Sequence, residues 1–259
     1  PPRSTLFPYT TLFRSHARQS ASDIDPDQAT PSTAVGEPRV EGRDTTHFSI
    51  LDHEGNRVAA TLSVNYPFGA CFVAAGTGVL LNDEMDDFSA KPGVANAYGL
   101  VGSQANAIEP GKRMLSSMSP TFVEGPDRIT ILGTPGGSRI ITMVLLGLLD
   151  AIDGRPVGDI VARGRFHHQF LPDRIEVEPA ALSAEVLAGL QFKGHQVRLL
   201  DDPYGNMQAI GWDLRSGQVS AASDPRAIGA SAVVSPSARR TQRQPSAQPV
   251  SDPATAVSR

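Results

Sequence analysis

The sequence predicts an α+β fold in which helices cover stacked β-sheets. Strand patterns cluster at both ends of the region between residues 45 and 226, and helical patterns lie between them. Hydrophobic residues make up 40% of the 259 residues, which is enough for a substantial core.

The expected elements follow from local periodicity and turn signals. The first is a hairpin with strands at 45–51 and 57–64, joined by the polar turn 52–56. A buried strand at 128–133 leads into an apolar helix at 138–152. The remaining elements are a short helix at 156–162 with Pro156 in its first turn, a strand at 174–178, an amphipathic helix at 183–192 with Ser183 as N-cap, a strand at 195–200, and a second hairpin of 206–213 and 217–222.

Composition divides the chain into four segments. Residues 1–15 repeat the unit Thr-Leu-Phe and resemble translated sequencing-adapter sequence, so we expect a non-native leader; an ordinary disordered leader is the alternative. Residues 16–44 are polar and Pro-rich and predict a linker. Residues 45–226 form the expected folded domain, and 227–259 an expected disordered tail rich in Ala, Ser, Pro, Gln and Arg.

Charge and composition exclude several classes of protein. A net charge of −4 argues against a nucleic-acid-binding surface. The single Cys71 excludes an internal disulfide and a cysteine-rich metal site. The longest uncharged apolar run, Ile140 to Leu149, is shorter than the roughly 20 residues that cross a bilayer. No secretory signal peptide is visible in this chain.

Thr45 and Thr46 open the first expected strand. A threonine hydroxyl is a weak nucleophile, but an N-terminal threonine carries its own base, the free α-amine. Thr45 could act in this way only after the chain is cut before it. Ser63 and Asn65 share one face of the partner strand and could lie beside Thr45. The alternatives are ordinary strand residues and solvent-facing polar positions.

Two polar motifs suit the two ends of an amino acid. The acidic run 82–89 contains Glu84 and Asp87, whose carboxylates could bind an ammonium group. A solvated turn or a calcium loop are the alternatives, although the run lacks EF-hand spacing. Ser116 and Ser117 could hold a carboxylate or satisfy a turn.

Gly136 and Gly137 lie between a strand and a helix. Their N–H groups at a helix start suit an oxyanion hole. A tight turn and a nucleotide phosphate site are alternatives, but the full phosphate-binding motifs are missing. The adjacent His167 and His168 would point to opposite faces of a strand, so hydrogen bonding is favoured over zinc binding.

Taken in order, these motifs resemble those of gamma-glutamyltranspeptidases (glutathione hydrolases). The resemblance covers roughly residues 20 to 226 and rests on the following segments: 45–49, Asn65, 84–89, 115–120, 135–139, 165–168 and the closing motif Ser223-Asp224-Pro225-Arg226. It implies an N-terminal nucleophile hydrolase fold, an αββα sandwich that is incomplete without the family's large subunit. Residues 45–226 would then be the small-subunit catalytic domain, and 16–44 the end of the large subunit.

The resemblance also implies residue roles. Thr45 would be the nucleophile, freed by self-cleavage between Asp44 and Thr45, with Ser63 beside it. Asn65, Glu84 and Asp87 would hold the substrate α-amine, and Ser116 and Ser117 its α-carboxylate. Gly136 and Gly137 would supply the oxyanion amides. Residues 91–99 resemble a lid loop with Tyr98 over the site, although a plain surface loop is also possible.

The implied reaction cleaves the γ-glutamyl amide of glutathione or related compounds. A threonyl ester would form and pass to water or to an amino-acid or peptide acceptor, with no metal or organic cofactor. Bacterial members are usually exported, so the resemblance implies a periplasmic or extracellular location. The alternatives are a glutaryl-cephalosporin acylase of the same family and an inert, unprocessed fragment that only binds a partner.

A departure from the family pattern concerns the large subunit. Members are made as a longer precursor, and the large subunit contributes an arginine that binds the α-carboxylate. We expect this chain to hold the small subunit and only the last stretch of the large one, without that arginine. A substantial apolar interface should therefore be exposed.

Overall fold

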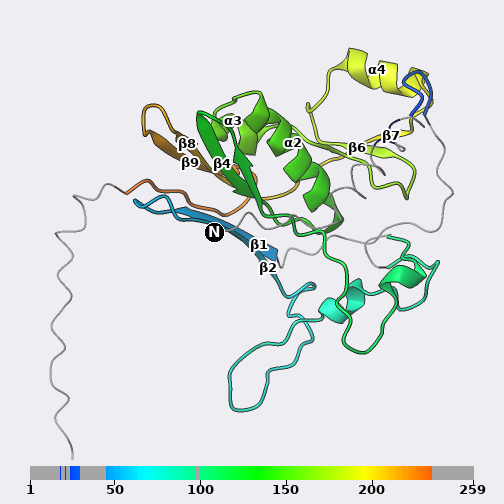
Figure 1. Cartoon of the computed structure of the whole chain (residues 1–259). Coiled ribbons are helices and arrows are strands. Elements are labelled where there is room, and N and C mark those ends of the chain that lie inside the picture. The colour runs from blue at the N-terminus through cyan, green and yellow to red at the C-terminus, as the bar shows by residue number, and fades with distance from the viewer. Residues whose placement is uncertain (1–17, 19–20, 22–23, 30–44, 97–99, 235–259) are drawn as a thin grey trace, which may run out of the picture.

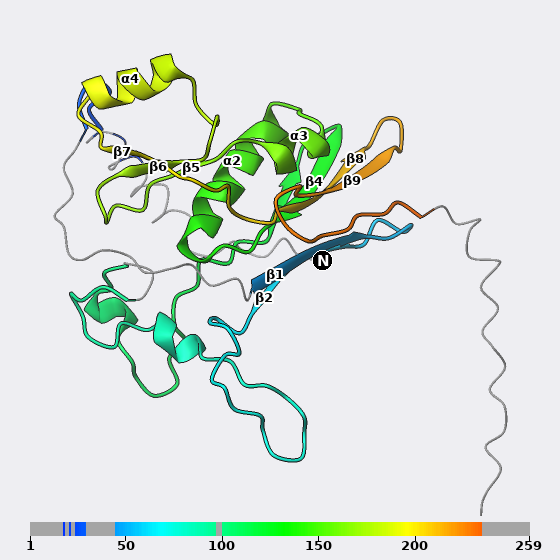
Figure 2. The same cartoon turned by 180° about the vertical axis from the view of Figure 1, so that it is seen from behind.

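The computed structural model describes residues 18, 21, 24–29, 45–96 and 100–234. Three layers are stacked in it: helices α2 (Ile140–Ile152) and α3 (Val157–Ala162), a four-stranded sheet, and a two-stranded hairpin on the opposite face (Figures 1 and 2). The sheet is antiparallel in the order β3 (Thr121–Glu124), β4 (Arg128–Gly133), β8 (Gln208–Asp213), β9 (Val219–Ser223). The hairpin consists of β1 (Thr45–Leu51) and β2 (Arg57–Ser63).

A smaller sheet lies beside the N-terminal end of α2. It contains β5 (Phe166–His167), β6 (Ile175–Val177) and β7 (Val197–Leu199), with β6 antiparallel to β5 and parallel to β7. Helix α4 (Ala184–Phe192) begins where predicted: the Ser183 hydroxyl caps it by accepting the Val186 N–H. The long segment between β2 and β3 contains two 3₁₀ turns, η1 (Glu84–Asp87) and η2 (Gln104–Asn106).

The expected elements are present with small shifts at their ends. Helix α2 begins at Ile140 rather than 138, because a 3₁₀ turn, η3 (Gly137–Arg139), precedes it. Strands β3 and β5 were not predicted: each has four residues or fewer, too short for a clear period. Beyond Arg226, the Ile228 carbonyl accepts a bond from Asn206 and the Ser231 hydroxyl donates to the Ala221 carbonyl. Contacts with the sheet thus continue into the segment predicted to form a tail.

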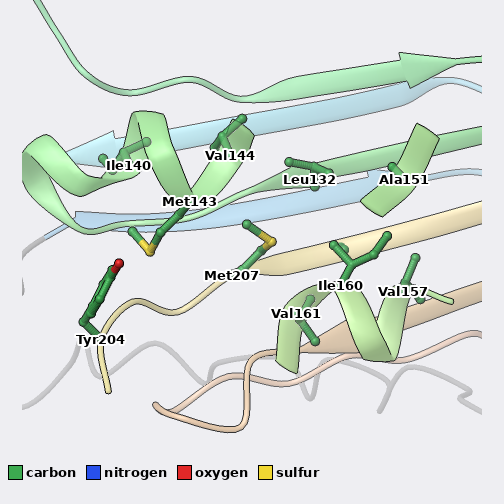
Figure 3. Close-up of a cluster of buried hydrophobic side chains, with 11 residues drawn as sticks. Leu132, Ile140, Met143, Val144, Ala151, Val157, Ile160, Val161, Tyr204 and Met207 are labelled. Atoms are coloured by element: carbon green, nitrogen blue, oxygen red, sulfur yellow. The ribbon is translucent and has the colours of Figure 1, made fainter. Parts of the chain in front are cut away.

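The hydrophobic core lies between the helices and the four-stranded sheet. Figure 3 shows Met143 and Met207 side by side at its centre, with Leu132 of β4 and Ile160 of α3 around them. All four side chains are almost fully buried. Burying each contributes about 1.5–3 kcal/mol, so this cluster holds the helices on the sheet.

The hairpin has its polar face inward. Thr45, His47 and Ser49 of β1 share the face that packs toward β4 and β8, whereas Phe48 and Ile50 point to solvent and are 41% and 50% exposed. Val58 and Leu62 on β2 extend this outer apolar face. An apolar sheet face that remains exposed marks a surface made for another layer. The predicted exposure of apolar surface is thus confirmed on this side.

The closing motif forms a buried ionic cluster. Asp224 accepts hydrogen bonds from Arg165, from the Met207 N–H and from Arg226. Arg165 and Asp224 are each 2% exposed, so each charge is stabilised by the other in place of water. Arg226 also pairs with Glu178 at 2.9 Å, which ties the end of the chain to the smaller sheet.

Removing this buried charge should destabilise the fold. We expect Asp224→Asn to lower the free energy of unfolding by about 3–5 kcal/mol, because Arg165 would remain buried without a carboxylate. Asp127→Asn is the matched control, because its ion pair with Arg215 is exposed and should contribute about 1 kcal/mol or less. Urea unfolding of both variants measures the difference. Equal losses would contradict the assignment.

In the part of the chain that the structure describes, no helix has the length and apolar character required to cross a membrane.

Candidate active site

Thr45 and Ser63 face each other across the open end of the hairpin. They are directly paired in the register, and their hydroxyl oxygens are 2.9 Å apart. The Asn65 N–H donates to the Ser63 oxygen at 2.8 Å, so the Ser63 proton is available for the Thr45 oxygen. Either hydroxyl can donate in the Thr45–Ser63 bond; when Ser63 donates, the Thr45 proton is left to a base.

Asn65 is held near this pair, but not for the reason that the sequence suggested. Strand β2 ends at Ser63, and Asn65 has a positive φ of 70°, so the two-residue period of a strand does not apply to it. Its buried side-chain amide donates to the Asp83 carbonyl at 3.3 Å. That bond connects the hairpin end to the acidic run.

The acidic run places carboxylates around η1. Burial, the neighbouring Glu84 carboxylate and a hydrogen bond to it together raise the pKa of Asp87 to about 7. Burial and the nearby Asp86, Asp87 and Asp83 carboxylates also raise the pKa of Tyr66. The Glu84 Oε1 atom is buried and has no hydrogen-bond partner among the described residues. Such a group of carboxylates is suited to receive a cation.

A cavity of about 450 Å³ lies next to this run. Asp87, Tyr66 and Phe88 line one side, and Gln169 and Leu171, which follow β5, line another. The acidic run and the segment after β5 therefore border one space, although they are far apart in the sequence.

The glycine turn has the backbone that only glycine adopts readily. Gly136 has φ 142° and Gly137 has φ 56°. A Cβ on Gly136 would come within 2.4 Å of Met143 Cε, so the Met143 side chain would have to shift to make room for it. It sits at the N-terminal end of α2, where unpaired N–H groups and the helix dipole favour an anion.

The two serines differ in their present bonds. Ser117 donates to the Gly137 carbonyl at 2.7 Å, so it would have to release that carbonyl to donate to a carboxylate. Ser116 is exposed and accepts the Met118 N–H at 3.2 Å, which leaves its own proton available for a ligand. The Ser117 bond to Gly137 places both serines next to the glycine turn.

His47 joins β1 to β4, the strand that precedes the glycine turn. Its ring lies against Gly133 at the end of β4, where an added Cβ would be 2.3 Å from it. Nδ1 bonds the Thr61 hydroxyl at 2.8 Å and Nε2 the Ser49 hydroxyl at 3.1 Å. Sequence reasoning gave His47 no role, although its alternation with Thr45 and Ser49 was a signal for one shared face.

Burial lowers the pKa of His47 from 6.5 to about 4, and this predicts acid sensitivity. Below pH 6.5 the unfolded chain binds a proton that the folded His47 does not, so stability falls progressively toward pH 4. We expect His47→Gln to reduce the loss between pH 7 and pH 4.5 by roughly 1–2 kcal/mol, since solvent screens part of the full effect. Urea unfolding at both pH values tests this. The exposed His53, changed to Gln, is the control and should leave the loss unchanged.

Both histidines of the adjacent pair are hydrogen-bonded to neighbouring side chains. His167 bonds Thr142 and Gln169, and His168 pairs with Asp173 at 3.2 Å, as the prediction of structural hydrogen bonding required. Among the described residues, no group of three or more His, Cys, Asp or Glu side chains is placed to hold a metal ion. Asp44 and Tyr98 lie outside the described residues.

Comparison with known proteins gives a consistent result. Residues 8–234 match the family model described as Gamma-glutamyltranspeptidase. The chain is 46% identical over 225 residues to a glutathione hydrolase proenzyme of Pseudomonas aeruginosa, covering 85% of this chain and 40% of that protein. The corresponding Escherichia coli proenzyme is 45% identical, with coverage of 83% and 37%. A solved gamma-glutamyltranspeptidase chain from Pseudomonas nitroreducens is 48% identical with a TM-score of 0.65, covering 73% of this chain and 100% of that one. The chain thus spans about two fifths of the length of these curated relatives.

Proposed function

Because this chain belongs to the gamma-glutamyltranspeptidase family and has the fold of its N-terminal nucleophile hydrolases, we propose that it carries the catalytic residues of a glutathione hydrolase. The reaction is hydrolysis or transfer of a γ-glutamyl group held as an ester on Thr45. The observation that carries the proposal is the Thr45–Ser63 pair, in which the hydroxyl of the first residue of β1 is hydrogen-bonded to a second hydroxyl.

The proposed first step is self-cleavage. The Thr45 hydroxyl oxygen attacks the carbonyl carbon of Asp44, and the peptide nitrogen leaves as the amine of Thr45. The resulting ester between Asp44 and the Thr45 oxygen is hydrolysed by water. The products are a chain that ends in a carboxylate at Asp44 and a chain that begins with a free amine at Thr45.

That amine is the base for turnover. With an ordinary pKa near 7.7–8.0, an α-amine accepts the proton of its own hydroxyl as the oxygen attacks the γ-amide. The Gly136 and Gly137 N–H groups donate hydrogen bonds to the amide oxygen and stabilise the negative charge that develops on it. The leaving amine takes the proton, and an ester remains on Thr45. Water or an acceptor amine then attacks the ester and regenerates the hydroxyl.

Recognition of the glutamyl group rests on charge. The substrate ammonium is assigned to Glu84 and Asp87, and it would offset the repulsion that raises the Asp87 pKa. The buried and unpartnered Glu84 Oε1 supports this assignment, because a buried carboxylate oxygen without a donor is costly. The α-carboxylate is assigned to Ser116 and Ser117.

The remaining length of the precursor is the proposed partner. The curated relatives of this chain are more than twice as long as the segment that they share with it. We assign the outer apolar face of the hairpin (Phe48, Ile50, Val58 and Leu62) to contact with that part, which would complete the sandwich. Export to the periplasm or outside the cell is proposed on family grounds alone.

The test uses the full-length precursor. Intact mass should reveal a new chain that begins at Thr45, and the cleaved protein should release p-nitroaniline from its γ-glutamyl derivative. The glutaryl anilide, which lacks the α-amine, should be a poor donor because Glu84 and Asp87 would have no cation to bind. Preference for the glutaryl compound would identify an acylase instead, and absence of cleavage would indicate an inert precursor.

A further inference from the structure

The turn that carries Gly136 and Gly137 is fixed by a side chain from the segment that follows β5. Ser138, the next residue, donates its hydroxyl proton to the side-chain oxygen of Gln169 at 2.6 Å. Because Ser138 shares a peptide unit with Gly137, this bond limits how the Gly137 backbone can rotate.

The orientation of Gln169 follows from its other contacts. Its amide nitrogen donates to the Leu171 carbonyl at 3.0 Å, and a carbonyl can only accept, so the amide cannot be flipped. The Gln169 oxygen therefore faces both Ser138 and His167 Nε2, the latter at 2.9 Å. An amide oxygen only accepts, so His167 must carry its proton on Nε2.

The same reasoning closes a ring of hydrogen bonds. His167 is 4% exposed, and its burial lowers the pKa of the ring, which favours the neutral form. With the proton on Nε2, Nδ1 accepts from the Thr142 hydroxyl at 2.7 Å; that hydroxyl also lies 3.1 Å from the Arg139 carbonyl, which competes for its single proton. Thr142 lies in the first turn of α2, and Ser138 lies just before that helix. The ring Ser138–Gln169–His167–Thr142 thus begins and ends on the segment that presents the glycine N–H groups.

A separate contact supports the same segment. Arg139 pairs with Glu176 at 2.5 Å and lies 4.4 Å from the centre of the Tyr204 ring. Glu176 is paired with His167 across β5 and β6, so both side chains reach the turn from one sheet. This ion pair remains when the Ser138 hydroxyl is removed. We therefore expect the turn to stay in position while its N–H groups become less well oriented.

We propose that Gln169 is a positioning residue for the oxyanion turn and acts through the Ser138 hydroxyl, an inference that rests on the proposed function above. Gln169 also lines the cavity that Asp87 borders. It therefore borders the space assigned to the γ-glutamyl donor and, through Ser138, supports the turn assigned to stabilise the reacting carbonyl. Its effect should appear in the transition state, where negative charge has developed, and not in the binding of the substrate.

The test compares Ser138→Ala, Ser138→Thr and Gln169→Leu in the full-length precursor. Rates are divided by the amount of cleaved protein, which intact mass provides. We expect Ser138→Ala to lower kcat for the γ-glutamyl anilide by about 10–100-fold with KM within about 2-fold, since misplaced N–H donors cost transition-state stabilisation. Ser138→Thr, which keeps the hydroxyl, should recover most of kcat. The double variant Ser138→Ala/Gln169→Leu should be no slower than Gln169→Leu alone.

Two further measurements distinguish the possible failures. Ser183→Ala removes a hydroxyl from the cap of α4, far from the turn, and should leave kcat unchanged. The ¹⁵N chemical shifts of His167 should report a neutral ring protonated on Nε2; an Nδ1 proton would overturn the ring geometry. An active wild type with unchanged kcat in Ser138→Ala would overturn this inference alone. A wild type that is cleaved but releases no γ-glutamyl group would overturn the proposed function and the inference together.

Discussion

The Thr45→Ala variant of the full-length precursor should remain a single chain and release no measurable γ-glutamyl product. Without the hydroxyl there is no atom to attack the Asp44 carbonyl and none to form the ester. Loss of a catalytic nucleophile lowers kcat by about 10⁴-fold or more in other hydrolases. Intact mass and the anilide assay measure the two losses separately.

Thr45→Ser is the matched control for this prediction. It keeps the hydroxyl and its partner Ser63, 2.9 Å away, and removes only a methyl group. Some cleavage and turnover should therefore survive. If Thr45→Ala is cut as efficiently as wild type, Thr45 is not the nucleophile of cleavage, whatever the assay of turnover reports.

The second large effect concerns Asp87. Asp87→Asn should lower kcat/KM for the γ-glutamyl anilide by about 10²–10³-fold, mainly through KM, because a neutral amide cannot pair with the substrate ammonium. The glutaryl anilide, which has no ammonium, should be affected far less. Wild-type kcat/KM should rise with pH through about 7, as the carboxyl with its raised pKa ionises, whereas the variant should keep only the rise from deprotonation of the Thr45 α-amine, near about 7.7–8.0.

Stability provides the control for Asp87. A carboxyl whose pKa is raised by folding destabilises the folded state progressively as pH rises from about 4 toward 7. The Asn variant should therefore be at least as stable as wild type at pH 8. Reduced stability at pH 8 would mean that the loss of activity reflects misfolding and would remove the support for an ammonium site.

The fold and the pairing of Thr45 with Ser63 could be predicted because their signals are local. A short polar turn between two alternating strands sets Thr45 opposite Ser63, and the register confirms it. Which face of the hairpin packs against the sheet could not be predicted, because the strand alternation is compatible with either face. Apolar residues normally point inward. Here Phe48 and Ile50 point outward and are exposed.

The supports of the site were beyond sequence reasoning for a different reason. Ser138 and Gln169 meet only because β5 and β6 bring a short segment back against the start of α2, and β5 has two residues. The position of Asn65 depends on a backbone angle that follows the end of β2. Neither feature leaves a periodic pattern in the sequence.

The pairing of Thr45 with Ser63 has a consequence for the end of the chain that cleavage would create. New chain termini normally fray, because a terminal residue has few bonds to oppose its motion. Thr45 is instead the first paired residue of a seven-residue strand, so the new amine and the hydroxyl beside it would stay in place. Little orientational freedom would then be lost when a substrate arrives, and the strand ladder, formed before cleavage, would already have restricted the reacting atom.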